Sequence, residues 1–344
     1  MKKTLVALAA AAAVTGAFAD VTISGQVDAG ITTTTTNTDG TKSTVNALTP
    51  AGMGQSGLNF GVTEDLGDGL SVYAAVNTIF SGTTVGSATS LFGIDNGSGV
   101  GLKGAFGDLF MGVKYNMTWW AMNAGDATGW NTAPGRVYAP TLNSGQNSNM
   151  IIYTLPTIVE GLTLAAENHL AAVDGNSGAF YGWSAKYASG PLAIQYAGNR
   201  TTTNAAVDNA ATLADGVTFV NGTTTADTFV SDVNTQAIAV TYDLGAAKLH
   251  YGNQTLDDSG STIAENKATY GVSIPVGAAS IGYAYTTAKF TNSDSTTEDT
   301  VGNKLFAKYT FSKRTYAYIN YGVSSTTGST YSLTATAFGV AHSF

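Results

Sequence analysis

The chain has 344 residues, no cysteine and a charged fraction of only 11%, well below the roughly 25% of a soluble domain. Its mean hydropathy is nevertheless only +0.07, and past the N-terminus no run of about 18 apolar residues could form a membrane-spanning helix. Without cysteine there is no disulfide or thiol chemistry, and the net charge of −8 makes nucleic acid an unfavourable partner.

The first predicted element is a signal peptide over residues 1–19. Lys2 and Lys3 supply its positive region, Leu5–Val14 supplies the apolar region, and Ala17-Phe18-Ala19 is an A-x-A cleavage site. We therefore expect an exported protein whose mature domain covers residues 20–344.

From Asp20 onward, short segments alternate polar and apolar side chains with period two, which is typical of strands with one wet face. In the first segment Val21, Ile23 and Val27 share one face, and Thr22 lies on the other. The predicted strands are Val21–Ile31, Gln55–Leu66, Gly69–Phe80, Ser98–Ala105, Asp108–Tyr115, Asn149–Leu155, Gly161–Leu170, Ala179–Tyr187, Pro191–Arg200, Val233–Asp243, Ala246–Thr255, Asn266–Pro275, Ala278–Phe290, Thr300–Phe311, Arg314–Val323 and Tyr331–Phe344.

The connections between these strands alternate strictly between short turns and longer loops, and Thr32–Gly54 is one of the polar loops. An even strand number and this asymmetry are expected of an outer-membrane barrel whose two ends face different compartments. The predicted fold class is therefore all-β, a transmembrane antiparallel β-barrel of about 16 strands.

One stretch, Asn116–Ser148, breaks the pattern because neither a helical nor a strand period runs through it. It holds three of the four tryptophans, Trp119, Trp120 and Trp130. Loops longer than about 15 residues in compact proteins are usually functional or disordered, and this one is too aromatic for a flexible linker. We expect it to fold inward as a constriction loop that narrows a pore.

Several segments resemble the trimeric general porins of Gram-negative bacteria, in the branch found in beta-proteobacteria and neisseriae. VTISGQVDAGI resembles that family's first strand, VGLKGAFGDLFMGVKY its fourth and fifth strands, and the terminal AFGVAHSF its last strand with a C-terminal Phe. The ordered set covers nearly all of the mature chain. MGVKY and SGLNFG depart from the family where arginines are common, so the arginine screen of the constriction is largely absent.

The resemblance implies a homotrimer in the cell outer membrane, in contact with outer-membrane lipid and lipopolysaccharide. It implies a general diffusion porin, which passes ions and small hydrophilic solutes through a water-filled channel, catalyses no reaction and uses no cofactor. Three alternatives remain at this point: a solute-selective porin, a barrel enzyme, and an adhesin with Thr-rich loops. No G-x-S-x-G elbow supports the enzyme, and each histidine stands alone on a strand.

Period two also assigns side chains to the two faces of the wall, and a Lys or Arg facing lipid near the midplane costs about 2–4 kcal/mol. The rule places Glu167, His169 and His250 on the lumen face, together with most of the lysines and arginines. The candidate pore residues are Lys103, Lys114, Asp126, Arg136, Lys186, Lys248, Lys267, Lys304, Lys308 and Arg314.

The lumen is therefore predicted to be basic, while the acidic residues populate loops and turns such as Asp39, Asp257 and Asp258. Wall charge sets ion preference in a narrow channel, which predicts a weak preference for anions. A cation preference stays open because the acidic mouths oppose it. Arg136 is either a constriction charge or a partner of Asp126. No metal site is expected, because Asp257-Asp258 fits a solvated loop better than a cation site.

Overall fold

The structure is a computed structural model that describes residues 19–80, 93–128, 146–170, 179–202, 232–259, 262–291, 295–327 and 331–344. Arg136 and the predicted signal peptide up to residue 18 lie outside these ranges. Within them, no helix is both long enough and apolar enough to cross a membrane.

The described part of the chain consists of strands and one short helix, α2 (Met117–Ala124). The strands are β1 (Asp20–Thr38), β2 (Thr41–Thr49), β3 (Gly57–Gly67), β4 (Leu70–Ile79), β5 (Gly93–Ile94), β6 (Gly99–Gly104), β7 (Gly107–Tyr115), β8 (Gln146–Thr154), β9 (Leu162–His169), β10 (Ala179–Ser189), β11 (Leu192–Thr202), β12 (Asp232–Asp243), β13 (Lys248–Asp258), β14 (Ala264–Val276), β15 (Ala279–Thr291), β16 (Thr297–Ser312), β17 (Thr315–Thr326) and β18 (Ser332–Ser343).

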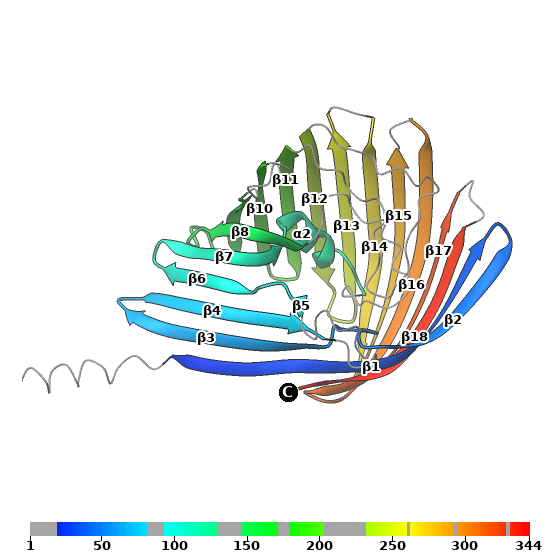
Figure 1. Cartoon of the computed structure of the whole chain (residues 1–344), viewed down its shortest axis with the longest axis horizontal. Helices are drawn as coiled ribbons and strands as arrows, with labels where there is room; N and C mark the ends of the chain where they lie inside the picture. Colours follow the sequence, from blue (N-terminus) through cyan, green and yellow to red (C-terminus); the bar gives the residue numbers. More distant parts are fainter. Residues whose placement is uncertain are drawn as a thin grey trace, which may run out of the picture.

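All of these strands except β2 and β5 form a closed ring of 16 antiparallel strands (Figure 1). The first strand closes it: Asp20–Gln26 pairs with β3, and Gln26–Asn37 pairs with β18. Closure removes the unpaired edges that lipid could not satisfy by hydrogen bonding. The predicted barrel of about 16 strands is confirmed.

The two faces of the wall differ as period two predicts. Large apolar and aromatic side chains are exposed on the outside, among them Tyr283, Tyr309 and Phe311. Along β13 the even-numbered residues are buried or half-buried on the inside, while Leu249 and Thr255 are exposed outside. Such a wall suits lipid on one side and a polar interior on the other.

The first connection differs from its prediction as a polar loop. Strand β1 continues to Thr38, a turn at Asp39 and Gly40 reverses the chain, and β2 pairs back along β1. Both turn residues have positive φ, 53° and 82°, as in the type I′ turns that match the twist of hairpins. Threonine is β-branched and favours extended backbone, so the run of threonines forms strand rather than loop.

Candidate functional site

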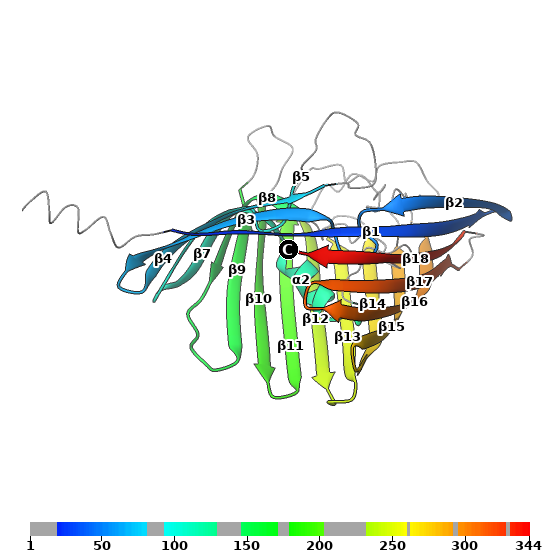
Figure 2. The same cartoon turned by 90° about the horizontal axis from the view of Figure 1, so that it is seen from below.

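The candidate site is the interior of the barrel, where the chain folds two segments onto the inner wall. The first is α2, which follows β7 directly and lies within the ring of strands (Figures 1 and 2). It packs against β10, β11, β12 and β13. The stretch predicted to lack periodic structure thus begins with a helix.

Capping by Asn116 starts α2. The Asn116 side chain accepts a hydrogen bond from the Trp119 amide N at 2.9 Å, and the Thr118 hydroxyl donates to the same side-chain oxygen at 3.0 Å. Helices of eight residues are not stable in isolation, so contacts with the wall must hold α2. The N-cap preference of Asn is the sequence signal that could have located this helix.

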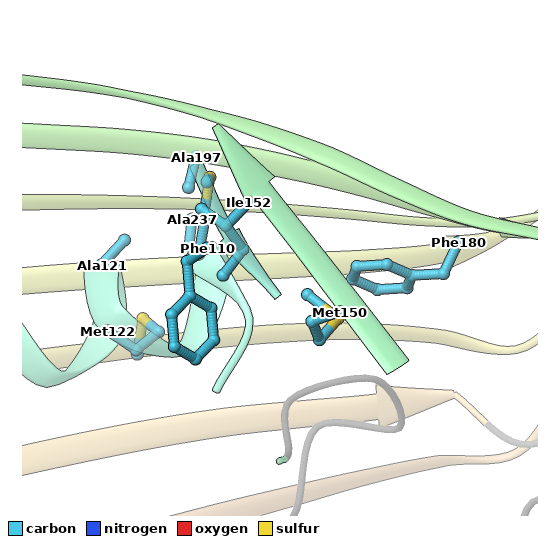
Figure 3. Packing of buried hydrophobic residues seen from close by; sticks show 9 residues of the cluster. Phe110, Ala121, Met122, Met150, Ile152, Phe180, Ala197 and Ala237 are labelled. Atoms are coloured by element: carbon cyan, nitrogen blue, oxygen red, sulfur yellow. The ribbon is translucent and has the colours of Figure 1, made fainter. Parts of the chain in front are cut away.

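An apolar cluster joins the buried face of α2 to the wall (Figure 3). Met122 and Ala121 approach Phe110 of β7, and small side chains at Ala197 and Ala237 leave room for the helix. Fully burying a large apolar side chain contributes about 1.5–3 kcal/mol. The cluster therefore fixes which face of α2 meets the wall.

Polar contacts fix where the helix begins. Both carboxylate oxygens of Glu167 accept from the Met117 amide N, each at 3.1 Å, and Glu167 is only 3% exposed. The Asn199 amide donates to the Thr118 hydroxyl at 2.8 Å. Glu167 lies on the inner side of β9, and it anchors the inward fold.

The end of α2 lies almost directly on the backbone of the wall. A Cβ atom at Gly125 would lie 2.6 Å from Gly252 Cα and 2.7 Å from Tyr251 O. Asp126, only 4% exposed, accepts from the Thr128 amide and hydroxyl, each at 2.8 Å. This contact closes the turn that follows the helix.

Reciprocal substitutions at this contact should have unequal effects. Gly125→Ala places its methyl group against backbone atoms that cannot yield, so the end of α2 must move away from the wall. A Cβ atom at Gly252 would lie 3.0 Å from the Thr269 methyl group and at ordinary contact distances from its other neighbours. The methyl group of Gly252→Ala therefore needs only a small adjustment. Overpacking of this kind costs about 1–3 kcal/mol. Single-channel conductance should therefore fall for Gly125→Ala and change little for Gly252→Ala; equal conductances would contradict the packing.

The second inward segment, residues 50–56, connects β2 to β3. Asp28 of β1 is fully buried and accepts from the Met53 and Gly54 amide N atoms at 2.9 Å each, and from the Tyr318 hydroxyl. A Cβ at Gly52 would overlap that same hydroxyl. The segment is therefore fastened to β1 and β17 from inside the barrel.

Five of the predicted lumen lysines are at least partly exposed on the inner side of the strands, namely Lys103, Lys114, Lys186, Lys248 and Lys308. Lys114 Nζ lies 4.4 Å from the centroid of the Phe110 ring, and Lys308 Nζ lies 5.3 Å from that of Tyr316. Cation–π contacts are worth about 0.5–1 kcal/mol at exposed sites and leave the charge in place.

Three other bases differ from their prediction. Lys267 and Lys304 face inward but are only 2% and 5% exposed. Lys267 Nζ lies 3.2 Å from Glu265 Oε1, so its ammonium group has a close acidic partner. Arg314 lies in the turn before β17, where its carbonyl accepts from the Ser343 amide. It is exposed at the end of the barrel and does not line the wall, because the strand begins one residue later.

Besides Glu167, further acidic residues lie on the inner wall, contrary to the expectation that the other acids lie in loops and turns. Asp258 and Glu265 are 1% and 3% exposed on β13 and β14. Asp108 of β7 lies across from Lys103 and accepts from the Tyr73 hydroxyl at 2.7 Å. The period-two pattern would have found Asp108, since it puts this residue on the same face as Lys114.

The histidines lie apart, each against a different neighbour. His250 contacts the Ser273 hydroxyl at 3.0 Å, and His342 contacts that of Thr315 at 2.9 Å. Over the described ranges, no group of three His, Cys, Asp or Glu residues could hold a metal ion.

A closed antiparallel barrel with an apolar outside and a charged inside defines a β-barrel protein of the bacterial outer membrane. The family model for Gram-negative porins matches residues 4–329. The chain belongs to the Gram-negative porin family, and it is a protein of the cell outer membrane.

Individual relatives support the same family. The major outer membrane protein P.IB of Neisseria gonorrhoeae is 39% identical over 114 residues, which are 33% of this chain and 32% of that protein. Its counterpart in Neisseria meningitidis serogroup B is 32% identical over 139 residues, 38% of each chain. The aligned part is thus about a third of the length of each neisserial protein.

A structural comparison shows the fold over almost the whole chain. The anion-selective porin from Comamonas acidovorans matches with a TM-score of 0.75 and 21% identity, covering 95% of this chain and 100% of that one.

Proposed function

We propose that the protein is a passive diffusion channel for ions and small hydrophilic solutes, with a weak preference for anions. No catalytic step and no cofactor belong to this mechanism. Solutes are sorted by size where α2 and the turn at residues 125–128 occupy the interior. The support is the double attachment of α2, by the apolar cluster and by Glu167, which holds a folded segment inside the barrel.

The observation that carries the anion preference is the unequal exposure of the inner charges. On the inner side of the strands, the acids Asp28, Glu167, Asp258 and Glu265 are at most 3% exposed. Lys114, Lys248 and Lys308 stay partly exposed. Charges in contact with water dominate the field met by a permeating ion. Asp108 is the exception, and it lies opposite Lys103.

We also propose that three copies assemble through the sector β1–β7. The exposed outward tyrosines and tryptophan lie on β10–β17, for example Trp183 and Tyr283. The exposed large apolar side chains of β1–β7 are aliphatic apart from Phe60 and Met111, with Phe106 in the turn between β6 and β7. Aromatic girdles mark the lipid interface, so the sector β1–β7, which lacks one, suits a protein neighbour. The sector β10–β17, which carries the aromatic side chains, suits outer-membrane lipid and lipopolysaccharide. Chemical cross-linking of the detergent-solubilised protein distinguishes a trimer from a monomer.

Two measurements test the channel. Liposomes containing the protein should swell in small sugars, whereas a closed barrel enzyme or adhesin would leave them unswollen. In a salt gradient across a planar bilayer, the reversal potential should indicate weak anion preference. Lys114→Glu should shift it toward cations. Lys289→Glu, at an exposed lysine on the outer side of β15, should leave it unchanged. A clear cation preference of the unmodified channel would refute the assigned selectivity.

A further inference from the structure

The C-terminal end of α2 rests on the inner wall beside His250. The turn that follows the helix lies against Gly252 of β13 and Gly271 of β14. His250 is two residues from the first and directly paired with the second, and it is one of the inward-facing residues of β13. Its ring therefore lies next to the point where α2 ends.

The two ring nitrogens of His250 have different surroundings. Nε2 lies 3.0 Å from the Ser273 hydroxyl. Nδ1 is buried and has no hydrogen-bond partner among the described residues. The Ala124 carbonyl, the last of α2, is close enough to act on the ring, although it lies outside hydrogen-bond geometry with Nδ1. Buried polar atoms without a partner are rare in folded proteins, so Nδ1 has an unused place for one hydrogen bond to the helix end.

Protonation of the ring supplies that hydrogen bond. A neutral imidazole has one N–H group, whereas the imidazolium ion has two and a positive charge. In the ion, Nε2 donates to Ser273 and Nδ1 donates toward the Ala124 carbonyl. The carbonyl groups at a helix C-terminus carry partial negative charge and attract cations. The protonated ring therefore binds the end of α2 more strongly than the neutral ring does.

Two charged side chains of the described chain act on this ring. Asp126, in the turn after α2, attracts a protonated ring, and Lys248, two residues away on β13, repels it. The residue paired with His250 on β12 is Thr241, which does not titrate, and β14 presents the Ser273 hydroxyl. Of these two charges, only Asp126 belongs to the segment that folds inward, so attraction to the ring acts directly on that segment.

We propose that His250 is a positioning residue that holds the C-terminal end of α2 against the wall when its ring is protonated. Glu167 and the apolar cluster hold the rest of the helix at all times, so loss of the proton frees only its last residues and the turn. From the wall these can move only toward the lumen, and the channel then conducts less. The inference rests on the proposed channel function and makes that channel depend on pH.

Single-channel recordings between pH 5 and pH 8, the range in which histidine usually titrates, test the proposal. We expect a steady current at pH 5 and brief steps to a lower level at pH 8. The ratio of low-level to full-level time should rise about tenfold, given the strength of a cation at a helix C-terminus. His250→Asn keeps an amide near the position of Nδ1 but cannot titrate, so the ratio should no longer depend on pH.

Two further variants show whether the effect belongs to this contact. His342→Gln, at a histidine that contacts Thr315 of β17, is the matched control and should keep the pH dependence of the unmodified channel. Asp126→Asn keeps an acceptor for Thr128 and should reduce the pH dependence without removing it, because the helix carbonyl remains. An unchanged pH dependence in His250→Asn, or an unmodified channel that behaves alike at pH 5 and pH 8, would overturn the role of His250.

Tryptophan emission in detergent micelles follows the same movement without any current, because Trp119 and Trp120 belong to α2. The emission should change between pH 5 and pH 8 in the unmodified protein and stay constant in His250→Asn. This result in a protein that carries no current would refute the channel function while supporting the position of His250. The same pH-dependent emission in both proteins would count against His250, whatever the current.

Discussion

Replacing Asp28 with alanine is expected to destabilise the barrel more than the other substitutions considered. The carboxylate accepts hydrogen bonds from the Met53 and Gly54 amides and from the Tyr318 hydroxyl, at a fully buried position. Each buried donor left without an acceptor costs about 1–3 kcal/mol. Urea unfolding in detergent micelles, followed by tryptophan fluorescence, should show a lower midpoint.

The matched control is Asp28→Asn. An asparagine can turn its oxygen toward the two backbone amides and its NH₂ group toward the Tyr318 oxygen, so most of the hydrogen bonding is retained. The loss of stability should be much smaller than for alanine. If Asp28→Ala unfolds at the same urea concentration as the unmodified protein, the segment at residues 50–56 is not held as described.

The barrel could be predicted from sequence because membrane strands obey a simple rule. Side chains alternate between lipid and interior, and the cost of a charge in lipid is large, so pairs such as Val113 and Lys114 fix the faces locally. Short turns then set the strand count. The hairpin formed by β1 and β2 escaped this reasoning because polar threonines on both faces produce no apolar alternation, although their β-branched shape favours strand.

The interior was harder to predict because its contacts join residues far apart in the chain. Met117 and Glu167 are 50 residues apart, and Asp28 and Tyr318 are 290 apart. Whether an acid on a strand is buried depends on which segment folds over it, and local patterns do not contain that information. Lys267 illustrates this limit: its face follows from period two, whereas its burial beside Glu265 depends on tertiary packing.

Replacing Glu167 with alanine is expected to release α2 while leaving the wall of the barrel intact. The Met117 amide would be buried without an acceptor, which costs about 1–3 kcal/mol. A penalty of about 2 kcal/mol changes an equilibrium roughly thirtyfold. The current should therefore become noisier and reach a second, higher conductance level in single-channel recordings.

The effect on stability distinguishes this site from Asp28. The backbone pairing of β9 with β8 and β10 does not depend on the Glu167 side chain, so the urea midpoint should change little. Glu167→Gln keeps an acceptor for the Met117 amide and should restore most of the quiet, lower conductance. A quiet current at the original conductance in Glu167→Ala would mean that the apolar cluster alone holds α2. A large fall in the urea midpoint would mean that Glu167 stabilises the barrel itself. A residue that only positions α2 should change the current and leave the urea midpoint almost unchanged.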